Sequence, residues 1–309
     1  MRALSNPLCL ADRRIDHALV LGGSGFIGAP LVRTLCAVGV RTTVLVHRTP
    51  PPGEARALRG TLERLPWAAL RADPPDVVFH LARIPGRGPI RGPLTRVRNR
   101  VANELLVRAL AEWERPPLVI YVGGTLAYGS QGDDDVREDR ALAPTSYARD
   151  YHHAEVPWLR ALRDRDVPVV VARPAWVLGP GSWFDAYYRR FIAEHHAVPL
   201  YGTGDNWMSI VHVEDCAGQL VNAARHALPA SIVNVFGGAP IRQREFAERL
   251  ARLTNLPIRE IALADRERAM REAFEFSCRI GTVHGALHEA YRLVHHDLDA
   301  ALAALLRST

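Results

Sequence analysis

Three evenly spaced glycines, Gly22, Gly25 and Gly28, are the clearest candidates for chemistry in this chain. The apolar run 18–21 precedes them, and an amphipathic helical pattern follows at 29–38. A strand, a tight glycine turn and a helix start form a cradle for a pyrophosphate, because the helix N-terminus carries unpaired N–H groups and a partial positive charge. A chance glycine loop is the alternative, but the flanking patterns favour nucleotide binding. The expected contacts in this turn are Gly22, Gly25, Phe26, Ile27 and Gly28.

The residues after the second apolar run indicate which dinucleotide is bound. That run, 41–46, is followed by His47 and Arg48, and it contains neither Asp nor Glu. In dinucleotide-binding folds an acidic residue near this point holds the adenosine ribose 2′-hydroxyl, whereas an arginine suits a 2′-phosphate. We therefore expect NADPH or NADP+, bound by Arg48 with His47 beside it. The alternative is that Arg48 is a solvated residue of a proline-rich loop.

Composition argues against several other kinds of site. The 309 residues include no lysine, which excludes a Schiff-base lysine and a P-loop lysine. The four cysteines are scattered without a C-x-x-C pair, so we expect a reducing, cytoplasmic location and no metal site. The net charge of +6 is spread along the chain, which argues against nucleic acid as a partner. The densest basic stretch, 83–100, is either a solvated loop and helix start or a site for an anionic ligand.

Alternating strand and helix patterns must position these residues. Strands are expected at 18–21, 41–46, 76–81, 118–122 and 169–172, and long helices at 96–113 and 147–163. Such alternation with buried apolar strands predicts an α/β fold, a Rossmann-type doubly wound parallel sheet. The sequence contains no run of about 18 apolar residues, so we expect no membrane span.

The second half of the chain is less regular. Helices are expected at 182–197, 214–227, 244–255 and 298–306, and strands at 210–213 and 232–236. We interpret residues 1–17 as a loose leader and 18–175 as the dinucleotide-binding Rossmann domain. Residues 176–309 then form mostly a small substrate-binding lobe, interleaved with the sheet by strands and helices that return to it.

Several motifs in order resemble the extended short-chain dehydrogenase/reductase family, over about residues 18–253. They are the glycine motif ending in Gly28, His80-Leu81-Ala82, Tyr128-Gly129, Pro144-Thr145-Ser146-Tyr147 with Glu155, Arg173-Pro174 through Gly181, and His212-Val213-Glu214-Asp215. The resemblance implies further cofactor contacts at Leu81, Ala82, Arg83, Tyr147, Tyr151 and Pro174.

The resemblance also implies a catalytic Ser or Thr, a Tyr and a Lys, and two of the three are missing. Tyr147 matches the tyrosine, but Tyr151 occupies the lysine position and Gly124 the serine position. Tyrosine is a weak acid near neutral pH, and a nearby cation lowers its pKa. We expect Tyr147 as the acid, Thr125 in place of the lost hydroxyl, and Tyr151 as an uncharged ribose contact. The alternative for Thr125 is an ordinary turn residue.

The expected substrate pocket is apolar. Sugar-nucleotide members of the family carry an arginine for the diphosphate where this chain has Met208, which argues against a sugar nucleotide. The expected substrate contacts are Thr125, Leu126, Trp183, Tyr187, Trp207 and Met208. The alternative is that these aromatic side chains simply pack the second lobe.

These observations predict an NADPH-dependent ketoreductase that acts on an apolar, aromatic substrate. The family includes reductases with incomplete triads in aromatic polyketide pathways, so the resemblance implies a polyketide-type substrate, as in antibiotic pathways. With two members of the triad missing, a phenol of the substrate could supply the proton. A non-catalytic NADPH-binding sensor or scaffold is the alternative, and a sugar-nucleotide epimerase or dehydratase is less favoured. The resemblance also implies a homodimer through the helices at 96–113 and 147–163.

Overall fold

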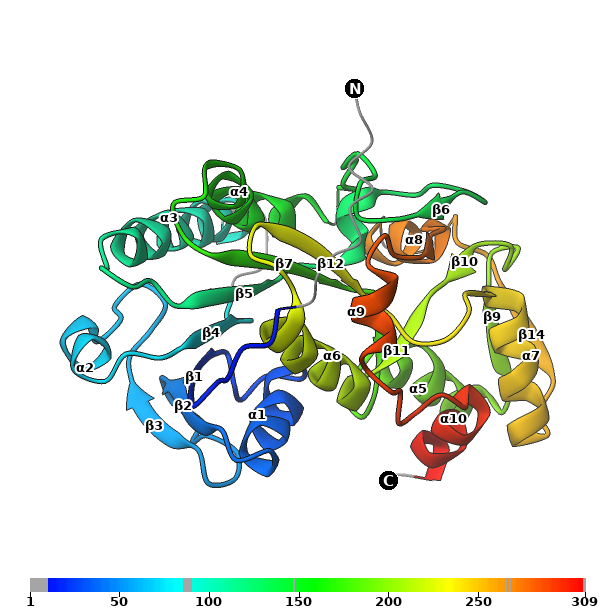
Figure 1. Ribbon diagram of the computed structural model, residues 1–309. Coiled ribbons are helices and arrows are strands. Elements are labelled where there is room, and N and C mark those ends of the chain that lie inside the picture. Colours follow the sequence, from blue (N-terminus) through cyan, green and yellow to red (C-terminus); the bar gives the residue numbers. More distant parts are fainter. Residues whose placement is uncertain (1–10, 86–90, 147, 265, 267, 308–309) are drawn as a thin grey trace.

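The central feature of the computed structural model is a seven-stranded parallel sheet (Figure 1). The structure describes residues 11–85, 91–146, 148–264, 266 and 268–307. The strand order is β12–β7–β5–β4–β1–β2–β3. These strands are β1 (His17–Leu21), β2 (Arg41–Val46), β3 (Arg56–Arg59), β4 (Val77–His80), β5 (Leu118–Val122), β7 (Val169–Pro174) and β12 (Ser231–Val235). The order reverses between β1 and β4, so the predicted doubly wound Rossmann sheet is confirmed.

Helices cover both faces of this sheet (Figure 1). Helices α1 (Gly28–Ala37) and α6 (Val213–His226) lie on one face, and α3 (Arg91–Ala111) and α4 (Arg149–Asp164) lie on the other, with α2 (Trp67–Ala72) at the edge. Within β1, Ala18 and Val20 pack toward α1 and α6, whereas Leu19 and Leu21 pack in the cluster with α3 and α4. Successive strand residues point to opposite faces, so burial on both sides explains the unbroken apolar run of β1.

A smaller lobe packs at one end of the sheet (Figure 1). Its core gathers Phe184, Tyr188 and Phe246 among the aliphatic side chains of the surrounding elements. These elements include β9 (Val198–Tyr201), β14 (Ile258–Ile261), α5 (Arg190–His195), α7 (Gln243–Thr254) and α10 (Leu298–Arg307). Between them in sequence, α6 and β12 return to the main sheet, so the lobe is interleaved with it.

Short elements join the lobe to the sheet. Strand β8 (Trp176–Leu178) pairs with β11 (Ile210–His212), β10 (Trp207–Met208) with β13 (Ile241–Arg242), and β6 (Asp135–Val136) with β15 (Arg279–Ile280). Helices α8 (Arg268–Glu275) and α9 (Gly285–Glu289) lie in the same region. Through β8 and α8 the lobe reaches the carboxyl end of the sheet, where the candidate site lies.

The described part of the expected leader is packed rather than loose. The backbone N–H of Ala11 donates to the carbonyl of His226, and Arg13 donates to the carbonyl of Ala227 at 2.6 Å. Ile15 is buried, and His17 already belongs to β1. The last carbonyls of α6 lack partners within the helix, and these contacts satisfy them. The expectation of a loose leader is therefore wrong for residues 11–17, while residues 1–10 lie outside the described ranges.

The helix expected at 182–197 differs in form. The segment Asp185–Arg189 makes a π-helical turn before α5 begins at Arg190. This turn holds Tyr188 buried against Phe184 and Phe246. Across the described ranges, none of the helices has the length and apolarity needed to cross a bilayer.

Candidate active site

The glycine turn has the geometry of an anion cradle. Gly22 has φ +90°, and a Cβ there would lie 2.9 Å from the backbone nitrogen of Ala82. A Cβ at Gly28 would overlap the carbonyl oxygen of Gly22. Helix α1 begins directly at Gly28, and its N-cap Ile27 offers no side-chain acceptor to the first N–H groups. These donors and the helix dipole suit a pyrophosphate, so the turn fits a dinucleotide cofactor.

Two arginines lie where the sequence analysis expects the adenosine end of the cofactor. His47 and Arg48 follow β2 and are exposed. Strand β3 runs parallel to β2 and pairs Arg59 with Val46. Arg59 thus lies at the same sheet edge as Arg48, and the sequence analysis missed it because Arg56–Arg59 lacks an apolar strand pattern. The arrangement provides two cations and, in β2 and the three residues after it, no carboxylate.

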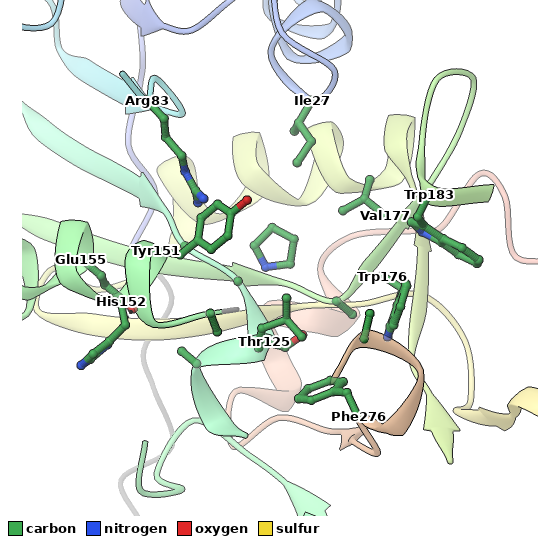
Figure 2. Close-up of a pocket in the computed structure, with 18 of the residues that line it drawn as sticks. Ile27, Arg83, Thr125, Tyr151, His152, Glu155, Trp176, Val177, Trp183 and Phe276 are labelled. Atoms are coloured by element: carbon green, nitrogen blue, oxygen red, sulfur yellow. Dashed lines mark ion pairs between the residues drawn. The ribbon is translucent and has the colours of Figure 1, made fainter. Parts of the chain in front are cut away.

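A cavity of about 290 Å³ opens at the carboxyl ends of the strands, beside the glycine turn. Its cofactor end is formed by Ile27, Arg83, Tyr151 and Pro174, and its floor by Gly123, Gly124 and Thr125. The far end is lined by Leu126, Trp176, Val177, Trp183, Tyr187, Ala273 and Phe276. Figure 2 shows Arg83 and Tyr151 on one side of the cavity and the tryptophans on the other. The structure thus brings together eight predicted site residues: Ile27, Arg83, Thr125, Leu126, Tyr151, Pro174, Trp183 and Tyr187.

The floor of the cavity lacks the family's serine but keeps a hydroxyl nearby. A Cβ at Gly124 would have only the Pro174 carbonyl oxygen near it, at 4.0 Å, so the glycine is not needed for space. The next residue, Thr125, begins a short 3-10 helix (Thr125–Tyr128) and is buried in the cavity wall. Thr125 therefore provides a hydroxyl one residue after the serine position.

The cofactor end of the cavity lacks lysine but contains a cation. Tyr151 lies in the first turn of α4, and the guanidinium carbon of Arg83 lies 4.0 Å from the centroid of its ring. Arg83 comes from the segment after β4 and lies next to Tyr151 (Figure 2). Tyr147, the expected acid, lies outside the described residues. A positive charge is thus present where the family resemblance predicts one, but it comes from another element.

A buried hydrogen-bond chain fixes the elements behind this end of the cavity. His80, the last residue of β4, contacts Asn103 Oδ1 through Nε2 at 2.7 Å, and Asn103 Nδ2 donates to the carbonyl of Ala154 at 2.7 Å. The chain therefore links β4, α3 and α4. Burial and, to a smaller extent, the nearby Arg83 charge lower the pKa of His80 to about 4, although the hydrogen bond to Asn103 opposes them. His80 is consequently neutral at physiological pH and packs edge-on against Tyr121 and Trp158.

Two residues expected to contact substrate lie elsewhere. Met208 is fully buried in the core of the lobe, and Trp207 packs between Arg242 and Arg279 while its indole donates to Asp133. Their strand, β10, pairs with β13, and neither residue lines the cavity. Placing Trp207 and Met208 at the cavity is therefore corrected. Trp176 and Phe276 take that position, and sequence reasoning missed both.

Three side chains that could ligate a metal ion lie together outside the cavity: His212, Glu214 and His295. His212, the N-cap of α6, accepts the backbone N–H of Glu214 at 3.3 Å. His295 Nε2 lies 2.7 Å from a carboxylate oxygen of Glu214. These contacts explain the cluster as a helix cap joined to the segment before α10. The expectation that the protein has no metal site stays a prediction.

Comparison with known proteins matches the site to one family. The family model described as "NAD dependent epimerase/dehydratase family" matches residues 18–235. A dTDP-glucose 4,6-dehydratase of Streptomyces griseus is 26% identical over 74% of this chain and 76% of its own length. The UDP-glucuronic acid 4-epimerase of Bacillus cereus, solved with UDP-glucuronic acid and NAD, has a TM-score of 0.76 at 18% identity, covering 94% of this chain and 99% of that one.

A human relative extends the comparison to a second cofactor. The human epimerase family protein SDR39U1, solved with NADPH, has a TM-score of 0.72 at 21% identity and covers 95% of this chain and 100% of that one. At such identities the solved structures show a shared fold. The family match, which spans most of the chain, confirms the extended short-chain dehydrogenase/reductase resemblance. Two proteins that are structurally similar to this chain were solved with NAD or with NADPH. The chain therefore belongs to the NAD dependent epimerase/dehydratase family.

Proposed function

We propose that the protein is an NADPH-dependent reductase of a ketone on a largely apolar, aromatic substrate. The observation that carries this proposal is the far end of the cavity, where Trp176, Trp183 and Phe276 contribute aromatic surface. Of the described residues that line the cavity, only Arg83 is an arginine, and it lies at the cofactor end. A sugar diphosphate needs cationic partners, whereas an aromatic substrate needs aromatic and aliphatic walls.

The cofactor preference is proposed from the adenosine end of the cradle. Arg48 follows β2 and Arg59 ends β3, and guanidinium groups bind phosphate with paired hydrogen bonds. An NAD-binding site of this fold holds the ribose diol with a carboxylate, which the sequence lacks at this position. The human relative solved with NADPH supports the same preference.

The chemistry requires a hydride, a proton and a stabilised oxygen. When bound, NADPH supplies the hydride to the carbonyl carbon, and one proton on the oxygen completes the alcohol. The hydroxyls of this chain that line the cavity are those of Thr125, Tyr151 and Tyr187, and each of them can donate a proton. Tyr147 and a phenol on the substrate are the other candidate donors. The walls hold the substrate and exclude water while the proton moves.

The test is consumption of NADPH with a panel of aromatic ketones, some with a phenol beside the carbonyl and some without. We expect turnover of aromatic ketones above that of small aliphatic ones, because only the former fill the aromatic end. Faster turnover of the hydroxylated ketones would identify the substrate as the proton source. Tight NADPH binding without consumption by any ketone would contradict the proposal and favour a sensor or scaffold.

A second candidate, a sugar-nucleotide dehydratase or epimerase, is favoured by the names of the relatives. The Streptomyces relative is a dTDP-glucose dehydratase, and the Bacillus structure contains UDP-glucuronic acid. The same protein is incubated with dTDP-glucose and UDP-glucuronic acid in the presence of NAD+ or NADP+. We expect neither sugar to change, because Met208 is buried where such enzymes carry an arginine. Conversion of either sugar would overturn the reductase proposal.

A further inference from the structure

We propose that Arg83 is the catalytic cation of this protein and replaces the lysine that position 151 lacks. The inference rests on the proposed function, because it assigns the group that binds the nicotinamide ribose and faces the reacting carbonyl. Arg83 and Tyr151 come from different elements, the segment after β4 and the first turn of α4. Figure 2 shows the guanidinium extending onto the Tyr151 ring at the cofactor end of the cavity.

The contact with Tyr151 leaves the guanidinium able to bind a ligand. The guanidinium carbon of Arg83 lies 4.0 Å from the ring centroid, and this cation–π contact needs none of the five N–H donors as a hydrogen bond. Within the described part of the chain, no carboxylate lies within ion-pair distance of Arg83. By contrast, Arg173 beneath the floor is neutralised by Glu155 at 2.8 Å. Arg83 is therefore a charge that a bound ligand can use.

The charge of Arg83 already acts on the buried groups behind the cavity. Burial lowers the pKa of His80, and Arg83 adds to this effect. Burial raises the pKa of Tyr121, and Arg83 opposes that rise. Because both groups lie next to the cofactor end, a developing negative charge in the cavity would feel the same field. A cation placed beside the reacting carbonyl stabilises the negative charge that develops there, and it does so more strongly once bound ligands exclude water.

The replacement explains why tyrosine is acceptable at position 151. A lysine there would place an ammonium group at the end of a flexible side chain. Tyr151 instead offers a ring that the guanidinium of Arg83, from the segment after β4, can contact, so the cation reaches the site from a different element. Arginine stays protonated, so Arg83 stabilises the alkoxide that forms on hydride arrival and donates to the ribose hydroxyls. The proton itself must come from a hydroxyl.

The decisive experiment combines removal of Arg83 with return of the lysine. We expect Arg83→Gln to lower kcat for the best ketone about 100-fold at saturating NADPH, the size seen for loss of one group that stabilises a developing oxyanion. Arg83→Gln combined with Tyr151→Lys should regain at least tenfold, because the ammonium then restores the charge. The matched control Arg252→Gln, an exposed arginine on α7, should leave kcat unchanged. Unchanged kcat in Arg83→Gln, or no recovery in the double variant, would overturn the proposal.

A binding measurement separates this inference from the proposed function. NADPH contains the nicotinamide ribose, whereas adenosine 2′,5′-bisphosphate contains only the adenosine end. We expect Arg83→Gln to weaken NADPH about tenfold or more and to leave adenosine 2′,5′-bisphosphate unaffected. Cofactor binding can be measured even if the protein reduces no ketone. The role of Arg83 can therefore be tested even if the reductase proposal fails. Equal weakening of both ligands would refute the assignment of Arg83 to the nicotinamide end.

Discussion

Arg173 of β7 and Glu155 of α4 form a buried ion pair directly beneath the floor of the cavity. Both Nε and Nη2 of Arg173 donate to Oε1 of Glu155, at 3.1 and 2.8 Å, and the two side chains are almost fully buried. Burial acts to raise the pKa of Glu155, but its contacts with His152 and Arg173 outweigh burial, so the pKa lies below its usual value. The pair fixes α4, which carries Tyr151, to the sheet.

Removing one charge of this ion pair should destabilise the fold more than replacing both side chains with apolar ones. We expect Glu155→Gln to lower the free energy of unfolding by about 3–5 kcal/mol, because the Arg173 charge is left buried without a counter-charge. Urea denaturation at pH 7 measures this change. The double variant Glu155→Leu with Arg173→Met should lose less than Glu155→Gln alone. If Glu155→Gln costs below about 1 kcal/mol, the pair is not an essential link.

The neutral state of His80 should make stability depend on pH. The pKa of His80 is about 4 in the folded protein and near the ordinary histidine value of 6.5 when the chain is unfolded. Between these values the unfolded chain binds the extra proton, so acidification from pH 6.5 to 4 favours unfolding, by up to about 3 kcal/mol. Thermal denaturation across this range should show a steeper loss for the wild type than for His80→Gln. Identical slopes would show that His80 is not held neutral.

The preference for NADPH should depend on Arg48. Its hydrogen bonds to a 2′-phosphate are charge-assisted, so Arg48→Ala should weaken NADPH about 10–100-fold and NADH less than about twofold. Titration of both cofactors by fluorescence measures the difference, with Arg252→Ala on α7 as the control. We expect Arg59→Ala to weaken NADPH as well, since β3 places that residue at the same edge. Equal losses for NADPH and NADH would remove Arg48 from the 2′-phosphate site.

We propose that the protein forms a homodimer through α3 and α4, as the family resemblance implies. Val97 and Leu105 are exposed on α3, together with Leu94 and Val101 at helical spacing. An exposed apolar stripe of this kind is typical of a helix that packs against another copy. The double variant Val97→Glu with Leu105→Glu should be monomeric by light scattering, whereas Leu253→Glu on α7 should not change the mass. A monomeric wild type would contradict the proposal.

The sequence by itself determined the dinucleotide-binding half. The order of apolar runs predicted β1, β2, β4, β5 and β7 within about two residues at each end, because strands buried on both faces must be continuously apolar. The spacing of Gly22 and Gly28 predicted the cradle, since a side chain at either position meets backbone atoms. The sequence also showed that tyrosine, not lysine, occupies position 151. These features are local, so the residues that encode them are neighbours in the chain.

Only the tertiary structure decided which side chains share the cavity. It placed Arg83 on the ring of Tyr151, although 68 residues separate them in the printed sequence and no local pattern links them. It brought Trp176 and Phe276 to the cavity wall, and it moved Trp207 and Met208 away from it. The physical reason is that the direction of a side chain on a short strand or loop depends on the element it packs against. That partner is fixed by the packing of the whole chain.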